Sequence, residues 1–305
     1  MKSRLFFFTI FFGIYVNVIA QKNGITLKVE YLERIKNRND SATLQLKYTK
    51  QVEFMQKQVE LYVVNDSSFY TYNLYETLKK NFSKILDSNS LDPAIAMQQS
   101  IFSMELNKAS DIKGFNTIYA KKLGINVFGI NDYIYNNTGY RKYFISDTIE
   151  KIQWKLLDET KKIDSFICQK AIGKFRGRLW EVWFTNQIPI SAGPWKLSDL
   201  PGLILEAADT SKLYSFICKS IQMPVKEINK NNLRLNKRIE KISIGAWASI
   251  QYNKYKAHNE EIKKIFDSVE KGGPAAYNNP KFDETVSIIK LNIKEPYRPI
   301  EIFQQ

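Results

Sequence analysis

Three carboxylates lie within one Pro- and Gly-rich stretch, residues 188–209, and they are the first candidates for chemistry. Asp199 precedes Pro201-Gly202, while Glu206 and Asp209 follow that pair. Two acids that converge can act as general acid and general base, so a hydrolase that cleaves a glycan or peptide is one hypothesis. A structural role is the alternative, because Glu206 falls near the end of a predicted strand and Asp209 in a turn, where Asp is common.

A second candidate site combines guanidinium groups with indole rings. Arg176-Gly177-Arg178 lies close in sequence to Trp180 and precedes Trp195. Arginine binds carboxylate or phosphate through paired hydrogen bonds, and tryptophan supplies an apolar platform. The same pattern is typical of a surface turn with the tryptophans buried beneath it, and we favour that structural interpretation.

Other catalytic templates are missing from the sequence. The single histidine, His258, lies in a polar helical stretch, so a zinc site with several histidine ligands cannot be assembled. The chain has no Gly-x-Ser-x-Gly motif and no Walker or Rossmann glycine pattern. We therefore expect no catalytic residues, no metal and no cofactor, and a protein that is not an enzyme.

The two cysteines occur in near-identical contexts. Cys168 and Cys218 each follow the tripeptide Ser-Phe-Ile in an alternating, strand-like run. In an oxidising compartment an even cysteine count favours a disulfide, which would close a loop around residues 188–209. Two buried thiols are the alternative.

The stretch 188–209, called the signature loop below, also carries a family resemblance. It reads Gly193-Pro194-Trp195-Lys196 and then Leu200-Pro201-Gly202-Leu203-Ile204. This resembles the GLPGLI family of secreted Bacteroidetes proteins, named for a Gly-Leu-Pro-Gly-Leu-Ile hexapeptide after a Gly-Pro-Trp-Lys element. Further matches lie at 154–156, 168–171, 176–178, 183–185 and 298–301. The resemblance implies export and a shared fold, and the family has no assigned activity.

One position departs from the family pattern. Asp199 stands where the hexapeptide has its first glycine. If that position needs a positive φ, aspartate can adopt it more readily than most residues. Pro201-Gly202 is the natural central pair of a type II turn.

The N-terminus has the features of a secretory signal. Residues 1–20 contain a basic start, a short apolar core and a small-residue cleavage site at Val18-Ile19-Ala20. We expect an exported protein that is periplasmic, outer-membrane associated or secreted, with no transmembrane span in the mature chain; a retained N-terminal anchor is the alternative. The net charge of +14 comes from lysines spread along the whole chain, which favours a solvated surface over nucleic-acid binding.

Residues 21–305 are predicted to form a single β-rich domain of the α+β class. Because 44% of the residues are hydrophobic, the chain can bury a sizeable core. Period-two alternation predicts strands at 25–31, 42–48, 61–64, 152–156, 166–171 and 179–184, and hairpins at 134–145 and 203–221. Helical spacing predicts a helical insertion at about 72–106 and a C-terminal helix at about 246–271. The expected fold is a large curved antiparallel sheet partly covered by these helices.

These features favour a non-enzymatic envelope protein. It would bind an apolar or anionic ligand, or dock an outer-membrane partner such as a transporter. The aromatic residues at 115–144 could line a ligand groove, although their alternation with polar residues favours cross-strand packing.

Overall fold

A computed structural model describes residues 26–36, 54–73, 75–77, 79–80, 113, 115–136, 139–225, 227–228, 233–253, 256 and 260. The expected signal peptide, the strand at 42–48, His258 and the match at 298–301 lie outside these residues. So do most of the helical insertion and the end of the C-terminal helix.

Twelve strands of the described chain form a single mixed sheet, which confirms the β-dominated α+β class. The strands are β1 (Thr26–Lys36), β2 (Phe54–Val64), β3 (Ser67–Asn73), β4 (Asn116–Lys122), β5 (Val127–Asn136), β6 (Gly139–Thr148), β7 (Lys155–Ile163), β8 (Phe166–Phe175), β9 (Arg178–Thr185), β10 (Leu203–Asp209), β11 (Tyr214–Gln222) and β12 (Glu240–Ser243). Their spatial order is β12-β6-β5-β4-β3-β2-β1-β11-β10-β9-β8-β7. Neighbouring strands are antiparallel except for the β12–β6 pair.

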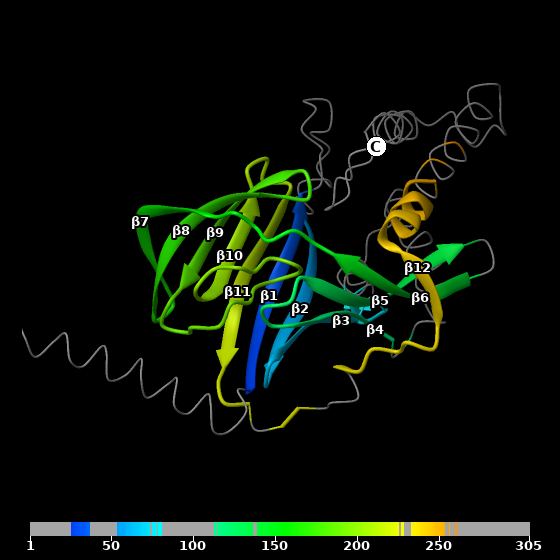
Figure 1. Cartoon of the computed structure of the whole chain (residues 1–305), viewed down its shortest axis with the longest axis horizontal. Coiled ribbons are helices and arrows are strands. Elements are labelled where there is room, and N and C mark those ends of the chain that lie inside the picture. The colour runs from blue at the N-terminus through cyan, green and yellow to red at the C-terminus, as the bar shows by residue number, and fades with distance from the viewer. Residues whose placement is uncertain are drawn as a thin grey trace, which may run out of the picture.

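The sheet is strongly twisted (Figure 1). The strands near β1 and β11 run steeply in this view, whereas those from β4 to β6 run nearly horizontally. Strand twist has a fixed hand and accumulates over many strands, so a sheet of this width curls. The sheet therefore has an inner face that can enclose other parts of the chain.

Apolar and polar side chains alternate along the central strands, so one face of the sheet is buried. In β1, Leu27, Val29 and Tyr31 are buried, while the intervening Lys28 and Glu30 are only partly buried. β2 repeats the pattern with Val59, Leu61 and Val63. The apolar set of each strand joins one continuous core, and the polar set lies on the opposite face.

The signature loop packs into the core. Its apolar members are buried: Ile188, Ile190, Ala192, Trp195, Leu197 and Leu200. Backbone hydrogen bonds from Leu203 N to Ile188 O and from Ile204 N to Ala192 O fold the loop back on the start of β10. The loop therefore occupies core space instead of projecting into solvent.

Glycine is required at position 202 for a reason other than the predicted turn. The expected type II turn needs a positive φ at Gly202, and Gly202 is not among the residues with positive φ. A Cβ placed there would lie 2.1 Å from the carbonyl oxygen of Thr185. Close backbone approach between the loop and the end of β9 therefore explains the residue.

Helices are minor elements of the described chain. Residues 75–77 and 79–80 are helical and begin the predicted insertion, although residues 72–73 still belong to β3. Residues 244–253 are helical and match the start of the predicted C-terminal helix. The described helices include none that is long and apolar enough to cross a bilayer.

The predicted strands differ from the structure mainly at their ends. The hairpins at 134–145 and 203–221 are confirmed as β5–β6 and β10–β11. Residues 152–154 are not a strand; β7 begins at Lys155. Trp154 in that segment instead donates a 2.7 Å hydrogen bond to the carbonyl of Ser198, so a contact with the signature loop replaces strand pairing.

Candidate functional site

One predicted ligand-binding residue, Arg176, and one signature-loop residue, Lys196, meet the same buried carboxylate. Lys196 Nζ donates to Asp147 Oδ2 at 2.7 Å, and Arg176 donates to Asp147 Oδ1 at 2.5 Å. Neither Lys196 nor Asp147 has any exposed side-chain surface. We call these three residues the Asp147 cluster; it joins the signature loop, β6 and the β8–β9 turn.

A second set of contacts fixes the middle of the signature loop. Lys121 of β4 donates to Ser198 Oγ at 2.6 Å, and burial lowers the pKa of this lysine. Asp199 Oδ2 accepts a 3.0 Å hydrogen bond from Ile152 N. Asp199 has φ 71°, so this position does need a left-handed backbone, and the side chain bonds the neighbouring segment.

The three candidate acids lie in separate local interactions. Glu206 pairs with Lys161 of β7. Asp209 pairs with Arg178 at 2.9 Å and accepts from Tyr214 N, also at 2.9 Å, within the β10–β11 hairpin. Asp199 bonds the segment before β7, as described above. Each acid therefore connects two elements of the fold. The structure does not bring the three acids together in the groove described below.

The four predicted ligand-binding residues all make contacts within the protein. Arg176 and Arg178 form the ion pairs above. Trp180 and Trp195 are buried, and their ring centroids lie 5.8 Å apart. Phe175 packs on Trp195 at 5.5 Å. This arrangement agrees with the interpretation in which the tryptophans lie beneath the turn.

Cys168 and Cys218 are both present as thiols, so the predicted disulfide is not formed in this structure. They lie on β8 and β11, and β9 and β10 separate those strands in the sheet. Cys168 belongs to the core and Cys218 packs against it. Burial raises the pKa of each thiol to about 11, which keeps both protonated at neutral pH.

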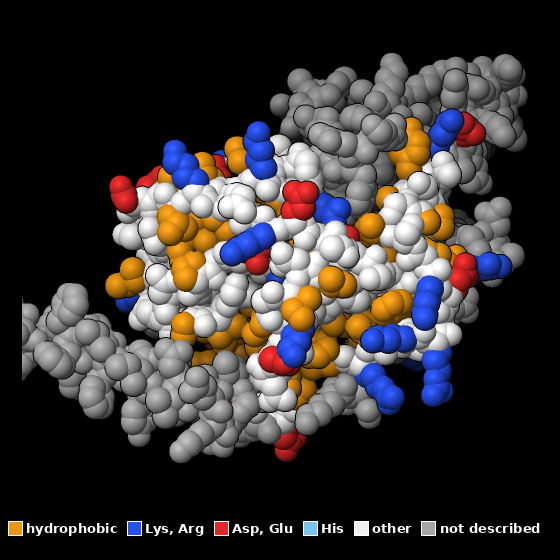
Figure 2. All heavy atoms as spheres, in the orientation of Figure 1, with side chains coloured by type: hydrophobic (Ala, Val, Ile, Leu, Met, Phe, Trp, Pro, Cys, Tyr) orange, Lys and Arg blue, Asp and Glu red, His pale blue; other side chains and the backbone are white. Residues whose placement is uncertain are grey.

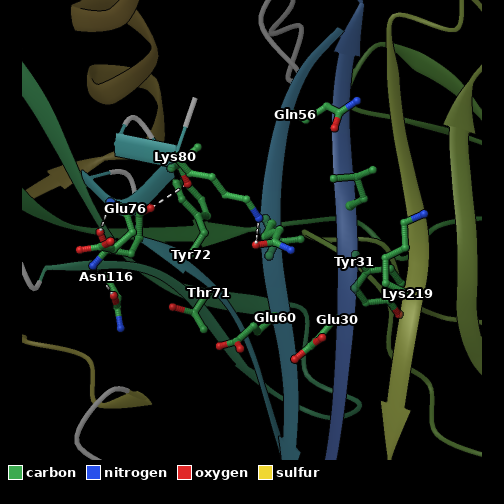
Figure 3. Close-up of a pocket in the computed structure, with 15 residues that line it drawn as sticks. Glu30, Tyr31, Gln56, Glu60, Thr71, Tyr72, Glu76, Lys80, Asn116 and Lys219 are labelled. Carbon is green, nitrogen blue, oxygen red and sulfur yellow. Dashed lines mark hydrogen bonds between the residues drawn. The ribbon is translucent and has the colours of Figure 1, made fainter. Parts of the chain in front are cut away.

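A groove of about 760 Å³ lies over the central strands, and sequence reasoning did not find it. Figure 3 shows its labelled residues projecting from β1, β2, β3, β4 and β11. The helical residues 75–77 and 79–80 contribute Glu76, Thr77 and Lys80 to its lining. The volume falls in the range of small-molecule sites.

Strand register places the polar residues of the groove in a row. Glu30 is directly opposite Glu60, and Glu60 is directly opposite Thr71. Ser220 of β11 extends the row on the other side of Glu30. Side chains in register on adjacent strands share one face of the sheet, so these groups face the same space.

Lys28 holds the two carboxylates of this row together. Its Nζ lies 2.7 Å from Glu30 Oε1 and 2.8 Å from Glu60 Oε1. Although burial opposes it, these hydrogen bonds raise the pKa of Lys28. The hydrogen bond from Lys28 lowers the pKa of Glu30. We call Lys28, Glu30 and Glu60 the carboxylate clamp, because the one lysine pairs with both carboxylates.

Thr71 has an unmet hydrogen-bonding requirement. It lines the groove and is only 3% exposed. Its Oγ1 has no hydrogen-bond partner in the structure, as judged over the described part of the chain. A buried hydroxyl without a partner costs free energy, so this position marks where a ligand could supply one.

No cluster of three or more His, Cys, Asp or Glu side chains that could bind a metal is found among the described residues. Figure 2 shows Lys and Arg side chains spread over the visible face, with several close together at the lower right. The distributed lysines match the expected solvated surface.

The chain is similar to part of a known protein family. A family model described as "N-glycanase peptide, N-terminal domain" matches residues 134–244, from the end of β5 to the start of the last described helix. No curated protein sequence matches the chain.

Solved structures give further, distant similarities. Two structures of PNGF-II, in C2 and P21 space groups, have TM-scores of 0.44 and 0.45 and 16% sequence identity. Each aligns with 74% of this chain but only 32% and 33% of its own length, so this chain spans about a third of the PNGF-II chains. A DUF1329 family protein from Desulfovibrio piger ATCC 29098 has a TM-score of 0.28 and 7% identity, covering 72% of this chain and 94% of its own.

Proposed function

We propose that this chain is an exported, non-enzymatic envelope protein of the GLPGLI type that binds a small polar ligand in the groove over β1–β4. The observation that carries the proposal is the buried Thr71 hydroxyl, which lacks a partner in a cavity of ligand size. The groove is built on strands of the central sheet, so it requires little rearrangement before binding.

The contacts of the signature loop support a binding role over catalysis. Asp199, Glu206 and Asp209 each bond a different element, and none of them lines the groove. General acid and base catalysis needs two groups that reach one substrate. A hydrolase that uses these acids is therefore the less favoured function.

The same contacts bear on the class of ligand. The apolar side chains of the signature loop pack into the core, which leaves the polar groove as the candidate site. The expected anionic ligand would have bound Arg176 and Arg178, but each already faces a carboxylate. Together these contacts favour a polar ligand in the groove over an apolar ligand at the signature loop or an anion at these arginines.

Docking of an outer-membrane partner such as a transporter is a second candidate. The strand β7 forms one edge of the sheet. On β7 itself Leu156 is 48% exposed, and on the neighbouring β8 Ile167 is 65% exposed. An edge strand with exposed apolar side chains can pair with a partner strand.

A ligand screen on the mature chain, residues 21–305, tests the proposal. Thermal shifts would be recorded with oligosaccharides, small polar metabolites and lipids, alongside a hydrolase activity screen. Gln56→Trp fills the groove, and Lys241→Trp places the same ring on exposed β12 as a control. We expect a polar compound to stabilise the wild type and Lys241→Trp but not Gln56→Trp. Stabilisation of Gln56→Trp as well, or turnover of a substrate, would overturn the proposal.

A further inference from the structure

We propose that the groove binds a neutral sugar residue, with the Thr71 hydroxyl bonding one hydroxyl of the sugar. This inference rests on the proposed function and specifies its ligand class. It follows from three properties of the groove: the kinds of polar groups, their charge balance and the unmet partner at Thr71.

The first property is the mixture of planar polar groups. Amide side chains from β2, β3 and β4 line the groove: Gln56, Gln58, Asn73 and Asn116. An amide offers a donor and an acceptor side by side, whereas a carboxylate offers two acceptors. Asn73 donates to Asn116 and accepts from Glu76 N, and Gln58 accepts from Lys80, so only part of the amide capacity is open to a ligand. Neighbouring hydroxyls of a sugar ring both donate and accept, so they complement the donors and acceptors that remain.

Part of the hydrogen-bonding capacity of the carboxylate clamp is used within the protein, and part remains for a ligand. Glu30 Oε1 accepts from Lys28 and its Oε2 from Ser220; Glu60 Oε1 accepts from Lys28 and its Oε2 from Tyr62. Each carboxylate oxygen can accept a second hydrogen bond, so the clamp retains capacity for ligand hydroxyls. Burial first, and then the Glu60 charge, raises the pKa of Tyr62 to about 12, so the phenol remains a donor.

The second property is charge balance. The lining contains the acids Glu30, Glu60 and Glu76 and the bases Lys80 and Lys219, and Lys28 adds a third cation from beside the groove. An anionic ligand would meet three carboxylates, and a cationic ligand would meet two lysines with Lys28 close behind them. A neutral ligand avoids both repulsions, so the balance favours a ligand without charge.

The third property is the position of Thr71 in the row. Glu30, Glu60 and Thr71 lie in register on three adjacent strands, so the row spans about 10 Å at the usual strand spacing. That length accommodates one sugar ring with its hydroxyls. Thr71 sits at the end of the row and is the member without a protein partner among the described residues.

Calorimetry on the mature chain tests the inference with maltotriose, N,N′,N″-triacetylchitotriose and mannotriose, and with inorganic phosphate as the charged probe. Thr71→Val keeps the shape and removes the hydroxyl, Thr71→Ser keeps the hydroxyl, and Thr148→Val makes the same change at an exposed site on β6. We expect Thr71→Val to lose about 3- to 10-fold in affinity for a neutral trisaccharide, as one hydrogen bond predicts. Thr71→Ser and Thr148→Val should bind like the wild type.

A separate measurement distinguishes binding from folding. Because the Thr71 hydroxyl is buried without a partner, its removal should leave the melting temperature of the unliganded protein unchanged or raised. Trisaccharide binding unchanged in Thr71→Val would overturn the assignment of Thr71. Binding of phosphate but not of any trisaccharide would overturn the sugar class and leave the proposed function standing. Absence of binding by every probe, together with no thermal shift in the wider screen, would overturn both.

Discussion

Lys196 Nζ and Asp147 Oδ2 lie 2.7 Å apart, and neither side chain has any exposed surface. Arg176 shares the same carboxylate at 2.5 Å. One buried acid of β6 therefore connects this strand to the signature loop and to the β8–β9 turn. Burying charges is costly unless they are paired, so the cluster specifies how these three segments assemble.

Removal of the shared acid should destabilise the fold strongly. Asp147→Ala takes the shared carboxylate away from the buried Lys196 and the mostly buried Arg176, and breaking a buried pair costs about 3–5 kcal/mol. Urea denaturation followed by tryptophan fluorescence measures the change in the free energy of unfolding. Asp158→Ala, at an exposed position on β7, is the matched control and should change it by less than about 0.5 kcal/mol. Equal stability of the two variants would contradict the role of the cluster.

Gly202 should tolerate no side chain. In Gly202→Ala the new Cβ would meet Thr185 O at 2.1 Å, so the loop or the end of β9 must move. We expect a loss of about 1–3 kcal/mol or more, as for other overpacked sites. Gly245→Ala is the control, since its nearest atom would be 4.0 Å away and the site is helical. That variant should be neutral or slightly more stable.

The thiols should react slowly in the native protein. With the pKa of each near 11, little thiolate exists at pH 8, and the thiolate is the reacting species. Titration with a thiol reagent should label neither cysteine in native protein and both after unfolding in denaturant. If the unfolded, unreduced protein from an oxidising compartment shows no thiol, the disulfide predicted from the sequence forms there.

The carboxylate clamp should stabilise the fold over a wide pH range. The pKa of Glu30 is lowered by the hydrogen bond from Lys28, so its contribution to stability is present above the unfolded value of about 4.3. That contribution is lost as the pH falls through the lower folded value. The pKa of Lys28 is raised, so its contribution is complete below about 10.4 and is lost only at higher pH.

We therefore expect the stability difference between wild type and Lys28→Met to be constant from about pH 5 to 10 and to shrink below about pH 4. Denaturation at a series of pH values measures it. Lys241→Met on exposed β12 is the control and should show no such dependence. A difference that persists at pH 3 would show that Lys28 acts through packing and not through the ion pairs.

Local patterns predicted much of the sheet. Alternation located β11 within one residue, because the buried face of a strand must be apolar at every second position. The continuous apolar run Leu203-Ile204-Leu205 located the start of β10. The departure from the family hexapeptide also pointed to a real constraint, since Asp199 has φ 71°. Residues 152–154 were misassigned because Trp154 contacts the signature loop, and that partner is distant in sequence.

The groove could not be predicted in the same way. Glu30, Glu60 and Thr71 each look like the ordinary polar side of an alternating strand. They form one site only because β1, β2 and β3 pair in a particular register, which is a long-range relationship. The sequence could not predict that Lys196 is buried against Asp147 for a similar reason, because the two residues lie far apart in the chain.

The sequence by itself determined the class of fold, most of the strands beyond residue 126 and a backbone-restricted loop, because alternation, proline and glycine act over a few residues. The tertiary structure alone decided that this loop packs into the core, that its charged residues pair with other elements, and that a polar groove with an unpartnered Thr71 lies elsewhere. The physical reason is that charge pairing, burial and strand register depend on residues far apart in the chain, and only folding brings those residues together.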